Sequence, residues 1–166
     1  WMHVPVFFMA TSILLFVRSY FGTGRMWLAY VVFGLRLLAL ILNFYFYPTI
    51  NYAAITGLQS FILPWGESVA IAIGVRNPWS IVAELSTLLL LIFLLDACIA
   101  CVRKAGRDEV GRHERRRVVI VGGGLLLSLS LVFVHSFLIH AGFVHALYDF
   151  SVFMLVPVLI TSYQLS

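Results

Sequence analysis

Charged residues are scarce in this chain, and those that occur are clustered. Only 11% of the 166 residues are charged and 62% are hydrophobic, which gives a mean hydropathy of +1.02. Soluble domains are about 25% charged. A chain this apolar cannot cover its surface with polar groups in water. The composition therefore excludes an ordinary soluble domain and indicates an integral membrane protein.

Cysteine and recognisable catalytic motifs are also nearly absent. The two cysteines, Cys98 and Cys101, lie in one apolar run and favour packing over a disulfide framework. The sequence has no nucleophile elbow, no HExxH motif and no carboxylate pair at catalytic spacing, so it predicts no catalytic residue in this chain. Three histidines recur every five residues, at His135, His140 and His145. In a helix this spacing places them on different faces, so they would not converge on one metal ion. We predict neither a metal site nor a cofactor.

Long hydrophobic runs are what the sequence has in abundance. A membrane-spanning helix needs about 20 apolar residues. Five runs approach or exceed that length, at about 1–17, 26–47, 80–102, 117–139 and 145–163. We therefore predict an all-α membrane protein, a bundle of five transmembrane helices that forms one integral membrane domain over residues 1–166.

The basic residues predict how the bundle is oriented. The stretch from Arg103 to Arg117 is dense in arginine, and the connector from Arg18 to Arg25 falls at the same end of the spans. Positively charged connectors face the cytoplasm. The N-terminus of this chain is then outside, its C-terminus is cytoplasmic, and the segment 48–79, whose one basic residue is Arg76, is outside.

The outer segment 48–79 is longer than a simple connector needs to be. From Ser68 to Val75, branched apolar residues alternate with small ones, which is typical of a strand. The region from Asn51 to Ile55 is its expected partner. We predict a hairpin, or a half-buried cap, on the outer face of the bundle.

Two ionisable residues lie deep in the predicted spans. Arg36 is about 15 Å and Asp96 about 10 Å from the cytoplasmic surface, counted at 1.5 Å per helical residue. Ionisable groups within a membrane usually pair or serve a function. We predict an ion pair that clamps the second and third spans, with a proton relay or switch as the alternative.

A second polar layer lies nearer the outside. Four spans each contribute one polar residue within about 10 Å of depth: Asn43, Glu84, His135 and Asp149. One interpretation is a polar cavity under the outer segment, which would add Glu67 and Arg76 to a binding site for a small hydrophobic or amphipathic ligand. The other is that each group only bonds a neighbouring backbone group or reaches the headgroups.

The order of several sequence stretches resembles a known kind of protein. These stretches are WMHVPV, LRLLALILNF, NYAAITGL, GESVAIAIGVRNPW, ELSTLLLLIFLLDA and the closing YQLS. Together they resemble the N-terminal seven-span sensor domain of bacterial sensor histidine kinases that also contain a PAS domain. Two further spans would precede Trp1 in that pattern, so the resemblance implies a part of a longer protein.

The resemblance implies a function that the residues alone do not. It implies a signal-sensing domain of a two-component system in the bacterial inner membrane, a homodimer whose last span passes the signal to a cytoplasmic PAS and kinase region. The lipid bilayer and a small ligand are the other expected partners, and nucleic acid is not expected. A membrane redox or haem subunit, a transporter component and a structural anchor remain open as alternatives.

Overall fold

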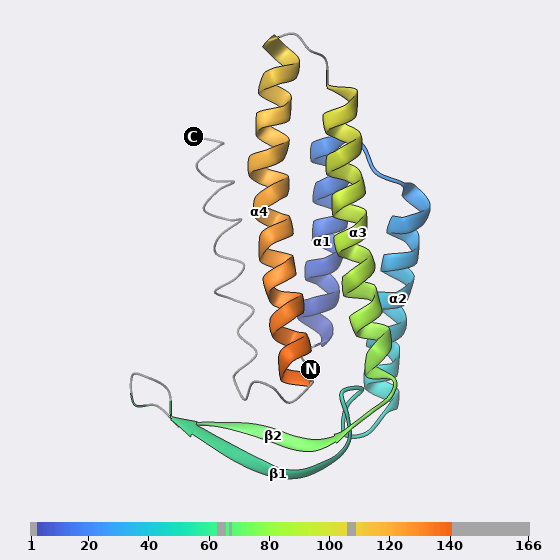
Figure 1. Ribbon diagram of the computed structural model, residues 1–166. Coiled ribbons are helices and arrows are strands. Elements are labelled where there is room, and N and C mark those ends of the chain that lie inside the picture. Colours follow the sequence, from blue (N-terminus) through green and yellow to red (C-terminus); the bar gives the residue numbers. More distant parts are fainter. Residues whose placement is uncertain (1–2, 63–65, 67, 106–108, 141–166) are drawn as a thin grey trace.

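The computed structural model describes residues 3–62, 66, 68–105 and 109–140, which form four helices and a two-stranded hairpin. In chain order the elements are α1 (His3–Phe21), α2 (Met26–Tyr45), β1 (Tyr52–Ile62), β2 (Ser68–Arg76), α3 (Ser80–Lys104) and α4 (Glu109–His140). The helices run side by side, and the hairpin lies across the end at which α2 finishes and α3 begins (Figure 1).

All four described helices are long and apolar enough to cross a membrane. Helices α2 and α3 agree with the predicted spans 26–47 and 80–102 to within two residues at either end. Four predicted spans therefore correspond to helices, while the fifth, 145–163, lies outside the described residues. Helix α1 continues past the predicted residue 17 and stops where Gly22 adopts a positive φ of 60° and donates its N–H to the carbonyl of Arg18.

The basic stretch 103–117 is mostly helical, which corrects the predicted loop. Helix α3 continues to Lys104, and α4 begins at Glu109, eight residues before the expected start of the fourth span. Arg115 Nη2 donates to the carbonyl of Ala105, 3.1 Å away, and the Arg117 guanidinium lies 4.4 Å from the ring centroid of Tyr20. These contacts hold Arg115 against the end of α3 and Arg117 against α1. The glutamates and arginines of this stretch also have a high intrinsic helix propensity.

The main core lies between α1, α3 and α4, with a contribution from α2. Its fully buried side chains include Val17 of α1, Leu94 of α3, Leu129 of α4 and Val32 of α2. Helices in a membrane gain little from the hydrophobic effect, so close approach at small residues matters more. Gly122 of α4 supplies such a point, since it faces Cys98 of α3.

The hairpin confirms the predicted strand that begins at Ser68. Its partner strand, β1, is longer than the predicted region from Asn51 to Ile55. Strands β1 and β2 are antiparallel, with Ile62 opposite Ser68 and Leu58 opposite Ala72. The register shifts twice near the base of β1. At that point a Cβ on Gly74 would lie 2.1 Å from the carbonyl oxygen of Ala54, so the irregular pairing requires glycine.

The hairpin is anchored only at its base among the described residues. Ile50 is fully buried against α2 and α3, and Asn77 is buried as well. By contrast, Leu58 is 72% exposed and Ile62 is 79% exposed. The structure therefore does not confirm a cap packed on the bundle; it shows a hairpin that projects from a buried base (Figure 1).

We expect the contact at Gly122 to limit the stability of the bundle. In Gly122→Ala the new Cβ would lie 2.4 Å from Cys98 Sγ and 3.3 Å from Phe21 Cζ. Such overpacking costs about 1–3 kcal/mol, so thermal unfolding of the purified protein in detergent should begin at a lower temperature.

Gly123→Ala is the matched control, because no described residue lies within 4 Å of its added Cβ. Cys98→Ala combined with Gly122→Ala should recover part of the loss, since it removes the sulfur that clashes. Equal melting of the Gly122→Ala and Gly123→Ala variants would contradict the close approach of α3 and α4.

Candidate functional site

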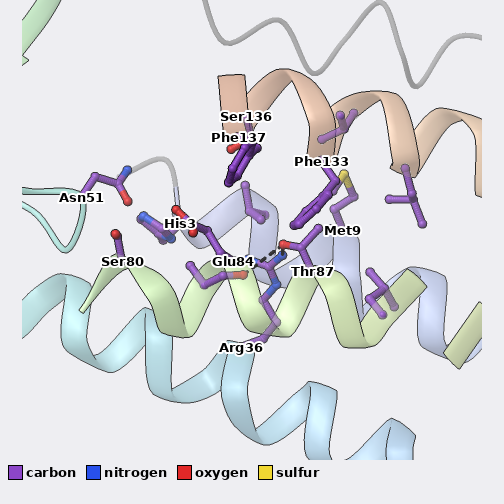
Figure 2. Close-up of a pocket in the computed structure, with 15 residues that line it drawn as sticks. His3, Met9, Arg36, Asn51, Ser80, Glu84, Thr87, Phe133, Ser136 and Phe137 are labelled. Carbon is purple, nitrogen blue, oxygen red and sulfur yellow. Dashed lines mark hydrogen bonds between the residues drawn. The ribbon is translucent and has the colours of Figure 1, made fainter. Parts of the chain in front are cut away.

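A cavity of about 100 Å³ lies between the helices at the hairpin end of the bundle. Helices α1, α3 and α4 form most of its wall, α2 contributes one residue and the segment before β1 contributes another (Figure 2). It is lined by His3, Val6, Met9, Arg36, Asn51, Ser80, Ala83, Glu84, Thr87, Leu90, Leu129, Val132, Phe133, Ser136 and Phe137.

The two ends of the cavity differ in character. His3, Asn51 and Ser80 lie toward one end, whereas Met9 and Phe133 lie toward the other (Figure 2). The polar end adjoins the hairpin, because Asn51 directly precedes β1 and Ser80 begins α3. The lining reaches Leu90, about 15 Å farther along α3. A molecule with one polar and one apolar end would match this arrangement.

Arg36 is the most unusual residue in the lining. It comes from α2, its side chain is only 6% exposed, and its Nε has no hydrogen-bond partner among the described residues. Its Nη2 donates to the Thr87 hydroxyl. Thr87 in turn donates its own proton to the carbonyl of Ala83, 3.0 Å away. Its hydroxyl oxygen therefore acts as the acceptor that holds the Arg36 guanidinium in place.

Glu84 does not form the counter-charge of Arg36 in this arrangement. The Glu84 carboxylate bonds Arg76 Nη2, and Arg76 Nε donates to Ser80 Oγ, 3.1 Å away. Arg76 is the last residue of β2, and both of its partners line the cavity. One side chain thus connects the end of the hairpin with the polar end of the cavity.

The structure brings together some of the predicted site residues but not all. Arg76 and Glu84 are in direct contact. Asn43 is buried in α2, and its Oδ1 has no hydrogen-bond partner among the described residues; His135 lies in α4, and neither residue is part of the cavity lining. The remaining two, Glu67 and Asp149, lie outside the described residues.

The sequence analysis missed the hydroxyl and amide residues of the lining. Asn51, Thr87 and Ser136 carry no charge, so nothing in their charge marked them as candidates for a binding site. One signal was available, because Ser80, Glu84 and Thr87 are spaced four and three residues apart and therefore share one face of a helix.

The structure gives Arg36 and Asp96 separate partners, which corrects the predicted ion pair between them. Asp96 accepts the backbone N–H of Arg25 at 3.1 Å, and the Arg25 Nε lies 3.6 Å from its other carboxylate oxygen. The physical reason is the stagger of the helices. Arg36 lies opposite Thr87 in antiparallel α3, so Asp96, nine residues after Thr87, lies opposite the start of α2.

No group of three or more His, Cys, Asp or Glu side chains that could hold a metal ion occurs in the part of the chain that the structure describes. The chemistry of the site thus comes from one guanidinium, one ion pair and several hydroxyl and amide groups. Comparison of the chain with known protein families, with curated proteins and with solved structures finds no match. The resemblance to sensor histidine kinases therefore stays a prediction.

The partners of Asp96 can be tested with two double-mutant cycles. Asp96→Ala should lower stability by about 1 kcal/mol, because it removes the acceptor for the backbone N–H of Arg25, the N-cap residue of α2. Coupling with Arg25→Ala should be about 0.5 kcal/mol, since the Arg25 side chain is largely exposed to solvent.

The second cycle combines Asp96→Ala with Arg36→Met. The two losses should add to within about 0.5 kcal/mol, as expected for residues that share no contact. Unfolding in mixed micelles with increasing sodium dodecyl sulfate would measure both cycles. A larger coupling between Arg36 and Asp96 than between Arg25 and Asp96 would restore the originally predicted pair.

Proposed function

We propose that this chain is the membrane-embedded sensor domain of a bacterial two-component sensor histidine kinase, and that it binds a small amphipathic molecule in the cavity. The observation that carries the proposal is the position of Arg76. It joins the end of β2 to Ser80 and Glu84, both of which line the cavity. A ligand that strengthened or weakened either contact would change how firmly the hairpin base is held.

The shape of the cavity supports binding of a ligand. Ligand sites are concave and mostly apolar, with a few polar groups that orient the ligand. Here a polar end beside the hairpin continues into an apolar part bounded by Met9 and Phe133. A ligand shifts a protein between two packings only if it binds one of them better. The Arg76 contacts offer one point at which two such packings could differ.

The distribution of charge supports the proposed orientation in the bacterial inner membrane. The end of the bundle opposite the hairpin carries Arg18, Arg25, Arg103 and Lys104 and the arginines that begin α4, whereas the hairpin end has Arg76. A strongly basic end is expected in the cytoplasm. The hairpin and the polar end of the cavity would then face the outside, where an external signal arrives.

The output half of the proposal rests on the sequence resemblance. In that arrangement the last span, at 145–163, would pass the change to a cytoplasmic PAS and kinase region, in a homodimer. The described residues include no kinase motif, so the test of this half is autophosphorylation of the intact kinase that would contain this chain.

Filling the cavity should abolish ligand binding. Val132 of α4 lines the cavity and is buried, whereas the adjacent Leu131 is 43% exposed and is not part of the lining. Native mass spectrometry of the protein released from its own membranes should show a retained small molecule. Val132→Phe should reduce that adduct at least tenfold, and Leu131→Phe, the matched control, should not.

The link to the hairpin needs a separate readout, which is hydrogen–deuterium exchange of β1 and β2 with and without the retained molecule. In protein that retains the adduct, Arg76→Ala should abolish the change in exchange, because the mutation removes the contacts of the hairpin base with Ser80 and Glu84. If the Val132→Phe variant kept both the adduct and normal autophosphorylation, the cavity would not be the sensor site. A protein without any adduct, whose kinase activity ignores Val132→Phe, would favour a structural anchor.

A further inference from the structure

We propose that the cavity binds the ionised carboxylate of a small, free amphipathic acid, and that Arg36 is the residue that receives it. This inference rests on the proposed function, since it names the chemical class of the ligand. It begins from Arg36, for which the described residues provide no ion-pair partner. Arg36 is 94% buried, and its Nε donor has no partner in the part of the chain that the structure describes.

Among the described residues, the acidic side chains nearest to Arg36 already have partners. Glu84, which lines the same cavity, is bound by Arg76, and Asp96 is bound by Arg25 near the opposite end of α2. Among the described residues, the partner of Arg36 is the neutral hydroxyl of Thr87. A buried guanidinium is stabilised by a negative charge, which an anionic ligand would supply.

The geometry suits a carboxylate. Figure 2 shows the guanidinium directed from α2 toward α3, beside Thr87 and Glu84 at the wall of the cavity. Because the Thr87 hydroxyl donates its proton to the Ala83 carbonyl, it accepts a hydrogen bond from Arg36 but has no proton to donate to a ligand. The planar guanidinium is well suited to binding both oxygens of a carboxylate. The apolar wall at Met9, Leu90 and Phe133 would then receive the alkyl part.

The depth of Arg36 distinguishes a free acid from a bilayer phospholipid. Arg36 lies ten residues after Met26 and nine before Tyr45, so it is about 15 Å from either end of α2. That places it near the middle of a hydrocarbon layer about 30 Å thick. The phosphate of a bilayer phospholipid lies at the surface of that layer. A short free acid is not fixed at the surface by a phosphate group, so its carboxylate can reach this depth.

The test uses a photoreactive diazirine derivative of decanoic acid and its methyl ester, added to the full chain in phosphatidylcholine nanodiscs. Labelled peptides are mapped by mass spectrometry, with unlabelled decanoate or methyl decanoate as competitor. The acid should label the residues that line the cavity, and decanoate should compete at least tenfold better than the ester. Arg36→Gln should remove that preference, and Arg36→Lys should retain part of it.

Arg25→Gln is the matched control, since this arginine is exposed at the start of the same helix and should not affect labelling. Thermal melting of each variant confirms folding, and the lysine variant keeps the test valid should the glutamine variant unfold. A second set of nanodiscs contains phosphatidylglycerol. Competition by that lipid would replace a free acid with a lipid headgroup as the source of the anion, against the proposal.

The two proposals fail in different ways. If acid and ester label the cavity equally and Arg36→Gln changes nothing, the carboxylate assignment is wrong while a ligand cavity survives. An acidic side chain beyond the described residues that already paired with Arg36, Asp149 for example, would give that same result. If neither probe labels the cavity and Val132→Phe leaves autophosphorylation unchanged, the sensor function fails as well.

Discussion

The burial of Arg36 between α2 and α3 is the constraint on which the rest of the site depends. A guanidinium in the middle of an apolar bundle must be held by hydrogen bonds, and Thr87 provides one from the facing helix. This contact sets the level at which the antiparallel helices meet. It also places Asp96 beside Arg25 at the start of α2, where its carboxylate accepts a backbone N–H that would otherwise lack a partner.

A second set of contacts organises the hairpin end. Ile50 is buried against Ala39 and Ala83, which fixes the chain where it leaves α2. Arg76 then bonds Ser80 and Glu84 where the chain enters α3. The base of the hairpin is therefore held by apolar packing on one side and by polar contacts on the other. The polar contacts depend on groups that also line the cavity, so the two features cannot be changed independently.

The sequence predicted those parts of the fold that depend on local pattern. Long apolar runs gave the spans of α2 and α3 almost to the residue, and alternation from Ser68 gave β2. It failed where the answer depended on how helices are staggered, as for Asp96, because counting from the ends of each span assumes that those ends are level. Within the site, Arg76 and Glu84 stood out by charge, whereas Thr87 did not, because a hydroxyl in an apolar helix carries no such signal.

The Arg76–Glu84 and Arg36–Thr87 contacts together connect the hairpin with the cavity, because their partners on α3 lie close to one another. Glu84 and Thr87 are three residues apart on α3, so they share a face, and Arg36 already bonds Thr87. While Arg76 holds Glu84, the positive charge of Arg36 stays available to an anion. Release of Arg76 would free Glu84 to neutralise Arg36 and would weaken anion binding. By linkage, an anion on Arg36 must then favour the packing in which Arg76 holds Glu84, and the base of the hairpin would be most firmly held when the ligand is bound.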